Sequence, residues 1–194
     1  MASDAGAVNL AAGIDNQMLK LVKNLSSIIV LVLVIIGCRQ IQKLSPPSVL
    51  KSTDGKFQIT VPGGWRDTPS LHEEASIRAA NSLNEMYVIV ISENKIDFAD
   101  GITLDKFTDI TRDSMMSKLG SPVASPPTKV TINGIPGRQF LLQGEGKTVK
   151  IAYLITNVET ESHYHQIITW TLLSRISQNQ PALQGITESF RAVK

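Results

Sequence analysis

The residues best suited to chemistry in this sequence are two histidines, His163 and His165, in a stretch that reads as a strand. Side chains two positions apart on a strand point to the same face, so both imidazoles can approach one ion. Glu159 and Glu161 are close in sequence, but the pattern identifies no third ligand. The pair is therefore a weak candidate metal site, and the competing interpretation is an exposed strand end with two solvated histidines.

Other patterns that resemble catalytic or ligand-binding motifs each lack a necessary part. The stretch 144–148, Gly-Glu-Gly-Lys-Thr, ends like a phosphate-binding loop, but Leu141 stands where that motif needs its first glycine. No serine lies in a nucleophile-elbow motif, and no base can be placed beside one to complete a catalytic triad. We therefore expect neither an enzyme nor a bound cofactor.

An uncharged, mostly apolar run extends from Leu25 to Cys38, which is the only cysteine in the chain. As a helix this run would reach only about 21 Å, at about 1.5 Å per residue. A bilayer core is about 30 Å thick. The run is preceded by Lys20 and Lys23. Its length and flanks favour the apolar region of a secretion signal over a membrane span.

The end of this run, Ile35-Ile36-Gly37-Cys38, resembles the lipobox of bacterial lipoproteins. In that motif a small residue lets the peptidase grip the chain, and the cysteine thiol accepts a diacylglyceryl group. The new amino terminus then takes a further acyl chain, and two or more chains anchor a protein stably. We therefore predict lipidation at Cys38. The alternative is an uncleaved short anchor with an incidental cysteine, and Met18 competes with Met1 as the start site.

Composition limits both the partners and the architecture of the rest of the chain. The formal net charge is only +2 and no dense basic run is present, which predicts no binding to nucleic acid. A single cysteine excludes an internal disulfide and any cysteine-based zinc site. We expect three parts, with residues 1–38 as an extension and signal or anchor, 39–54 as a tether, and 55–194 as one globular domain.

The globular part reads as an α+β domain, with an antiparallel sheet and helices packed on its faces. Period-two alternation and runs of β-branched residues predict strands at 56–61, 75–81, 86–91, 129–133, 138–143, 147–157 and 163–173. Glycines are expected to turn the chain at 134–137 and 144–146. The proline-rich stretch Ser121–Pro127 is expected to be a loop.

Two helices are expected, at 103–119 and from Asn179 to the end of the chain. Thr103 suits the cap of the first helix, while Asn179 and Pro181 suit the cap and first turn of the second. The apolar stripe predicted for the first helix comprises Leu104, Phe107, Ile110, Met115 and Leu119. The stripe of the second comprises Leu183, Ile186, Phe190 and Val193. Trp65 and Trp170 are expected to be buried.

Three landmarks, taken in this order, resemble the PsbP-like superfamily over roughly residues 54–194. They are an opening strand and turn, a turn in the middle of the domain and a closing helix end, namely Phe57-x-Ile59-x-x-Pro62-x-Gly64-Trp65, Gly134-Ile135-Pro136-Gly137 and Ser189-Phe190. The resemblance implies an antiparallel sheet sandwiched between helical layers, an α/β/α arrangement.

The resemblance also implies a function. Members of the superfamily include extrinsic proteins of photosystem II, cyanobacterial lipoproteins on the lumenal side of thylakoids, bacterial envelope lipoproteins and a distant branch that binds the Ran GTPase. What they share is protein binding without catalysis. We therefore expect a lipoprotein that binds an extracytoplasmic or thylakoid-lumenal membrane complex, such as photosystem II or its assembly intermediates. The alternative is an envelope lipoprotein that binds a small molecule or metal through His163 and His165.

Overall fold

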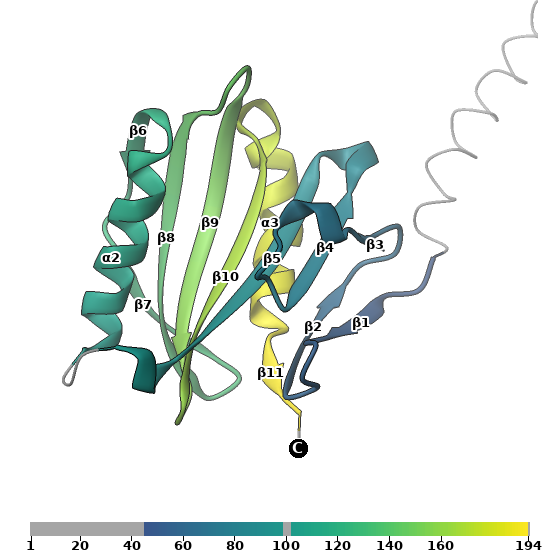
Figure 1. Ribbon diagram of the computed structural model, residues 1–194. Coiled ribbons are helices and arrows are strands. Elements are labelled where there is room, and N and C mark those ends of the chain that lie inside the picture. The colour runs from purple at the N-terminus through teal and green to yellow at the C-terminus, as the bar shows by residue number, and fades with distance from the viewer. Residues whose placement is uncertain (1–44, 99–101, 194) are drawn as a thin grey trace, which may run out of the picture. The chain divides into compact units, whose positions relative to one another are not determined.

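The computed structural model describes residues 45–98 and 102–193, and all of these from Pro46 onward belong to one compact unit (Figure 1). The predicted signal and Cys38 lie outside the described residues. The larger of two antiparallel sheets contains β3 (Arg66–Asp67), β4 (Ile77–Asn81), β5 (Met86–Asn94), β6 (Gly120–Ala124), β7 (Thr128–Ile132), β8 (Ile135–Glu145), β9 (Lys150–Glu159) and β10 (His163–Leu172). Its order is β3-β4-β5-β10-β9-β8-β6, and β7 also pairs with β8.

The smaller sheet joins the two ends of the described chain. It contains β1 (Ser48–Lys51), β2 (Phe57–Val61) and β11 (Arg191–Ala192), in the order β1-β2-β11. The helices are α2 (Leu104–Ser117) and α3 (Ile176–Glu188), with short 3-10 turns η1 (Pro69–Leu71), η2 (Ser82–Asn84), η3 (Lys95–Asp97) and η4 (Leu173–Arg175). These elements confirm the predicted α+β domain, which has antiparallel sheets and two helices.

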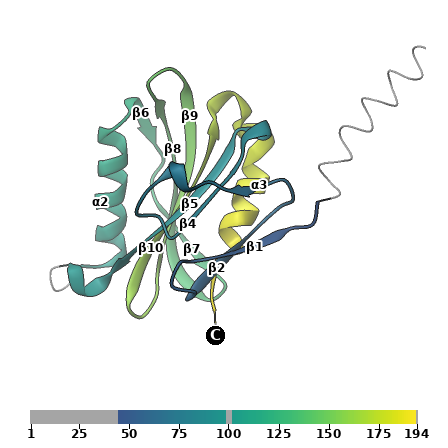
Figure 2. The same ribbon diagram turned by 45° about the vertical axis from the view of Figure 1, so that its right-hand side comes forward.

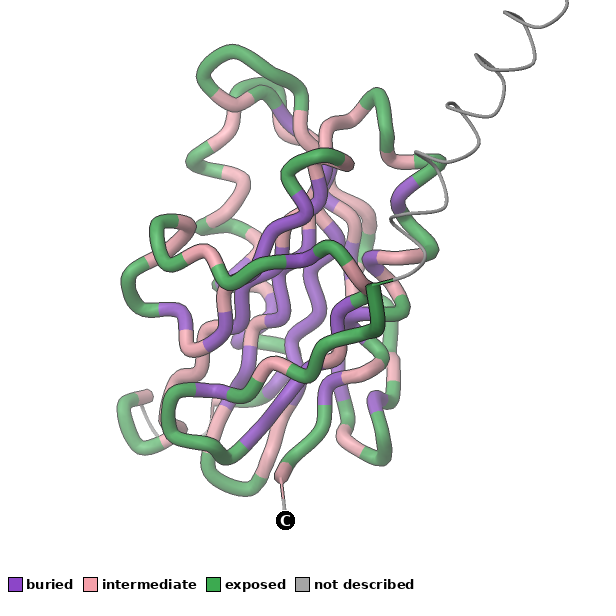
Figure 3. The backbone as a smooth tube through the Cα atoms, turned by 90° about the vertical axis from the view of Figure 1, so that its right-hand side faces the viewer, coloured by how far each residue is buried: buried purple, intermediate pink, exposed green. Residues whose placement is uncertain are grey.

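The two helices lie on opposite faces of the larger sheet (Figures 1 and 2). α2 packs on β6, β8 and β9, whereas α3 packs on β9, β10 and β2. Buried positions concentrate along the strands and exposed positions in the connections (Figure 3). Because β5 and β10 lie inside the sheet, both faces of these strands carry buried side chains, as the apolar run 86–91 predicts.

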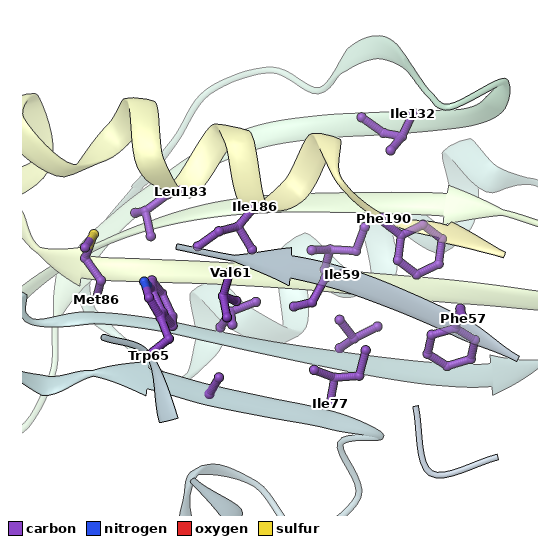
Figure 4. Close-up of a cluster of buried hydrophobic side chains, with 14 of the residues drawn as sticks. Phe57, Ile59, Val61, Trp65, Ile77, Met86, Ile132, Leu183, Ile186 and Phe190 are labelled. Carbon is purple, nitrogen blue, oxygen red and sulfur yellow. The ribbon is translucent and has the colours of Figure 1, made fainter. Parts of the chain in front are cut away.

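The main hydrophobic core lies between the larger sheet, α3 and β2 (Figure 4). Ile59 and Val61 from β2 are fully buried there beside Leu183 and Ile186 from α3, and Trp65 is buried as predicted. Each such aliphatic side chain stabilises the fold by about 1.5–3 kcal/mol relative to exposure to water. The apolar residues that alternate along β2 therefore pack directly against the apolar stripe of α3 in one core.

α2 begins where the sequence predicts, because Thr103 Oγ1 accepts a hydrogen bond from the Lys106 N–H at 3.2 Å. Its buried face differs from the prediction. Ile110 is 45% exposed, while Thr108 and Thr111 are buried and donate hydrogen bonds to carbonyls one turn earlier in the helix. These bonds satisfy the hydroxyls, so threonine can occupy the sheet-facing side of the helix.

Two segments that lack a strand pattern pair with neighbouring strands. Ser48–Lys51, expected to be part of the tether, pairs with β2 from Ser48 opposite Val61 to Lys51 opposite Gln58. Gly120–Ala124 forms β6, although most of it was expected to lie in a loop. Proline is tolerated in β6 because this strand lies at the edge of the sheet, where a missing N–H leaves no central ladder position empty.

The turn between β7 and β8 is tighter than the predicted one. Asn133 and Gly134 form it with positive φ angles of 49° and 85°, and Ile132 pairs directly with Ile135. Positive φ at both central residues is the signature of the two-residue hairpin turn that matches strand twist. The residues from Ile135 to Gly137, which were predicted to lie in the turn, therefore belong to β8.

α3 begins at Ile176, earlier than predicted, so Pro181 lies inside the helix and Asn179 does not cap it. Proline removes the N–H that would bond the carbonyl of Ser177. Ser177 is exposed, so that carbonyl can bond water instead. Asn179 is buried, and its side chain ties the helix to the sheet.

Candidate functional site

The first candidate site is the end of the sheet where β10 begins. The imidazole rings of His163 and His165 stack there, with centroids 5.7 Å apart and planes 20° apart. The prediction that both rings share one face of the strand is therefore confirmed. They line a small hollow of about 170 Å³, together with Asp54, Lys56, Phe57, Thr160, Glu161, Ser162, Phe190 and Ala192.

His165 is only 3% exposed, and both of its ring nitrogens are engaged. Nδ1 lies 2.9 Å from Ser92 Oγ, and Nε2 lies 3.2 Å from Thr160 Oγ1. The Thr160 hydroxyl donates to the His163 carbonyl, so it accepts from Nε2–H. The Ser92 hydroxyl then donates to Nδ1. These contacts fix one neutral tautomer of His165.

The environment keeps the His165 ring neutral. Burial, the largest cause, and the proximity of His163 together lower its pKa from 6.5 to about 4, against an opposing effect of Asp54. Phe57 packs edge-on to the ring and Phe190 lies at 5.2 Å between centroids. A solvated pair of histidines is therefore the wrong interpretation for His165, which is a core residue.

The geometry gives little support to a metal site at this end of the sheet. Ion binding at His165 would require displacement of Ser92 or Thr160 from a ring nitrogen. Glu159 instead forms an ion pair with Lys95 at 2.7 Å. Within residues 45–98 and 102–193, no three histidine, cysteine, aspartate or glutamate side chains gather in a way that could hold a metal ion.

The second candidate site is a larger groove of about 550 Å³ beside α2 on the opposite face of the sheet. We call it the α2 groove. Apolar side chains from the central strands line it, namely Ile89 and Ile91 from β5, Ile168 and Trp170 from β10, and Tyr153 from β9. Phe107, Ile110, Thr111, Ser114 and Met115 line it from α2, Lys118 lines it just after that helix, and His72, Glu74, Glu93, Phe98 and Gln166 complete it.

An aromatic row crosses the sheet at one end of the α2 groove. Tyr87, Trp170 and Tyr153 occupy directly opposite positions on β5, β10 and β9. The Tyr87 and Trp170 rings stack with centroids 5.2 Å apart, and Tyr153 lies 6.1 Å from Trp170. All three are half-buried. Trp170 was expected to be buried, but α2 covers β8 and β9 and leaves this part of the sheet accessible.

The phenol of Tyr87 acts as a fixed donor at this end. Its hydroxyl donates a hydrogen bond to Glu85 Oε2 at 2.7 Å. Burial, the hydrogen bond and the charge of Glu85 raise the pKa of Tyr87 to about 12. Tyr87 therefore stays protonated, and its ring contributes to the aromatic row without adding charge.

Two carboxylates of the α2 groove, those of Glu74 and Glu93, lie away from the aromatic row. Gln166 Nε2 donates to Glu93 Oε1, which fixes the position of that carboxylate. Glu74 also lines the groove, and the antiparallel β4–β5 register, with Ile77 opposite Val90, brings the residues before β4 toward the end of β5 that carries Glu93. In the described part of the chain, neither carboxylate forms an ion pair. The α2 groove therefore has an aromatic row at one end and, at the other, two carboxylates that form no ion pair within the described residues.

The predicted lipidation site, Cys38, lies outside the described residues. Neither helix of the described ranges has the length and apolar character required to traverse a bilayer. The groove residues Trp170, Tyr153 and Met115 were not predicted as a site. For Trp170, the available signal was that it shares one face of the strand 163–172 with Tyr164 and Ile168.

Scans against models of known families and against curated proteins find no match. Solved structures do match in fold. Cyanobacterial PsbP (CyanoP) from Synechocystis sp. PCC 6803 aligns with a TM-score of 0.58 and 12% identity, over 77% of this chain and 94% of that protein. LpqN, involved in cell envelope biogenesis of Mycobacterium tuberculosis, aligns with a TM-score of 0.56 and 14% identity, over 76% of this chain and 91% of that protein.

At such low identities the likeness concerns the path of the backbone and not individual side chains. It covers nearly all of both solved proteins. The expectation drawn from three short sequence landmarks is confirmed at the level of architecture. The described domain has a PsbP-like fold.

Proposed function

We propose that this chain is a non-enzymatic lipoprotein whose PsbP-like domain binds a membrane protein complex on the extracytoplasmic or thylakoid-lumenal side. The observation that carries the proposal is the accessible aromatic row beside α2. Tryptophan and tyrosine dominate the energetics of protein interfaces because they bury much apolar area with few rotatable bonds. Trp170 and Tyr153 are half-buried and line an open groove, so a partner can still remove area from water.

The membrane enters the proposal through Cys38. A diacylglyceryl group on that thiol, with a further acyl chain on the new amino terminus, would hold the domain at the bilayer surface. Confinement to a thin layer raises the effective concentration of the domain near a membrane complex. An interface of modest area beside α2 would then be sufficient for occupancy.

The identity of the complex depends on the source of the chain. The resemblance to PsbP proteins supports photosystem II or its assembly intermediates in a photosynthetic cell. The fold shared with LpqN, a protein of envelope biogenesis, supports an envelope complex in other bacteria. In both settings, we propose that the domain binds a protein complex and catalyses no reaction.

The proposal is tested on native membranes that express the full chain with its leader. Complexes are separated by native electrophoresis and probed for the wild type, Trp170→Ala and Leu83→Ala. Leu83 is 78% exposed in η2 and does not line the α2 groove, so its variant is a matched control. We expect the wild type and Leu83→Ala to migrate with a large complex and Trp170→Ala to migrate alone. A wild-type chain that never migrates with a complex would refute the proposal.

The alternative function, a metal or small-molecule carrier that uses His163 and His165, has a direct test. Metal content is measured on the purified full chain and on the His163→Ala and His165→Ala variants. Because both nitrogens of His165 are occupied by hydroxyl partners, we expect no stoichiometric metal in any of the three. One equivalent of metal in the wild type that is lost in both variants would favour the carrier.

A further inference from the structure

We propose that the α2 groove takes a segment of a partner protein in which an apolar side chain stands close to a lysine or arginine. This inference rests on the proposed function and specifies the chemistry of the partner. Both features of the partner, the apolar side chain and the basic side chain, are inferred from the lining of the groove. Its centre and one end are apolar, and its other end is acidic.

The apolar requirement follows from the floor. Ile91 on β5 and Ile168 and Trp170 on the neighbouring strand β10 all line the groove. On the facing helix, Ile110 lines the groove and is 45% exposed. The apolar surface therefore continues from the floor to the lip of the groove. This accessible apolar surface can receive an aromatic or large aliphatic side chain of a partner segment.

The basic requirement follows from Glu74 and Glu93. Ser76 N–H donates to the Val90 carbonyl at 2.8 Å, which continues the β4–β5 ladder and brings the stretch before β4 alongside the end of β5. Both carboxylates line the groove, and Gln166 holds one of them. A lysine or arginine placed between them would form charge-assisted hydrogen bonds, the stronger kind in proteins.

The direction of the bound segment follows from the positions of the charges. Glu93 is opposite Tyr164, and Tyr164 stacks on Phe107 near the start of α2. Lys118 lies at the other end of the helix, past Met115. A basic residue is therefore attracted to the Phe107 end and repelled from the Lys118 end. The apolar residue of the segment would lie between them, over Ile168 and against Trp170.

The first experiment selects ligands without assuming a sequence. A random peptide library displayed on phage is panned against the full chain held in nanodiscs, with the Trp170→Ala chain as the counter-selection target. We expect enriched peptides to carry an aromatic or large aliphatic residue close to a lysine or arginine. Enriched peptides without a basic residue would overturn the inference.

The second experiment measures where a selected peptide binds. In a Trp65→Phe background the fluorescence comes from Trp170, because the chain has two tryptophans. A synthetic peptide from the selection should shift this emission. Glu74→Gln combined with Glu93→Gln should weaken binding about tenfold or more and abolish its salt dependence, because glutamine keeps the shape but not the charge. Leu83→Ala should bind like the wild type, and urea unfolding checks that each variant folds.

Two outcomes separate this inference from the proposed function. If the double glutamine variant still migrates with the native complex as the wild type does, docking stands and the basic-segment inference falls. If peptides bind as expected but the wild type joins no native complex, the inference about the segment that the α2 groove binds is supported and the proposed function is refuted. Saturation of the Trp170 signal by dodecylamine at lower concentration than by any peptide would identify a small cationic amphiphile and overturn the inference.

Discussion

The imidazole of His165 on β10 lies edge-on to the phenyl ring of Phe57 on β2, with the ring centroids 4.7 Å apart. This contact places a titratable side chain where the larger and smaller sheets meet. Phe190, which follows α3, closes the same contact from another side. The charge state of one imidazole is therefore coupled to the packing of both sheets.

We expect the free energy of unfolding to decrease as the pH falls from about 6.5 to about 4. Burial lowers the pKa of folded His165 from 6.5 to about 4. In this window the unfolded chain binds a proton that the folded chain does not, so acid favours unfolding. At about 1.36 kcal/mol per pKa unit, the loss is on the order of 3 kcal/mol. Urea unfolding at a series of pH values measures it.

Two variants assign the effect to this residue. His165→Phe keeps a ring between Phe57 and Phe190 but cannot titrate, so its midpoint should change little across the same window. His163→Gln removes a neighbouring imidazole and should keep most of the slope. A wild-type urea midpoint that stays constant from pH 6.5 to 4.5 would contradict the account of His165 as a neutral core residue.

Asn179 should contribute to stability although it is polar. Its Nδ2 donates to the Asn84 carbonyl at 2.9 Å and to Thr171 Oγ1 at 2.8 Å, linking α3 to η2 and β10. Asn179→Ala leaves buried acceptors without their donor, and we expect a loss of about 1–3 kcal/mol in the free energy of unfolding. The control is Gln184→Ala, whose side chain bonds only the exposed Glu188. Equal urea midpoints for both variants would show that the Asn179 bonds contribute nothing.

Two glycine substitutions should have opposite signs. Gly134 has a φ of 85°, so Gly134→Ala places a side chain in a strained conformation and should destabilise the fold by about 1–2 kcal/mol. Gly185 lies inside α3, and a Cβ there meets no atom within 4 Å. Gly185→Ala should stabilise by about 0.5–1 kcal/mol, because alanine loses less entropy in a helix. Thermal unfolding of the two variants tests the pair, and a stabilised Gly134→Ala chain would disprove the hairpin geometry.

Lipidation at Cys38 should be visible in the mass of the mature chain. We expect the native protein to begin at Cys38 and to carry a diacylglyceryl group on the thiol. Cys38→Ser should retain the leader and show no added lipid. Trp170→Ala serves as the control, because it should be processed like the wild type. Recovery of native chains that still carry residues before Gly37 and an unmodified thiol would contradict the prediction.

The sequence predicts those elements whose pattern is produced locally. The alternation in 57–61 and the capping position of Thr103 depend on neighbouring residues alone, and both appear in the structure. β1 and β6 were missed because pairing with an adjacent strand creates them. Neither Ser48–Lys51 nor Gly120–Ala124 carries a repeated apolar pattern.

The candidate sites show the same limit. The shared face of His163 and His165 follows from strand geometry, but the burial of His165 depends on Phe57 and Phe190, which are distant in sequence. The exposure of Trp170 and Ile110 depends on which strands α2 covers. Amphipathic spacing gives the direction of a side chain relative to its own element, and it does not show how much of the facing surface a neighbour leaves open.

The placement of β1 has a mechanical consequence if Cys38 holds the chain to a membrane. A pull along the linking residues reaches the domain at Ser48, whose partner is Val61 at one end of the β1–β2 ladder. Such a ladder separates by successive rupture of single pairs, which needs less force than breaking all of them together. β2 would remain held by β11 and by its packing on α3. β1 can thus detach under load and lengthen the connection to the membrane, with the loss of Leu50 from the edge of the main core, while β2 stays in place.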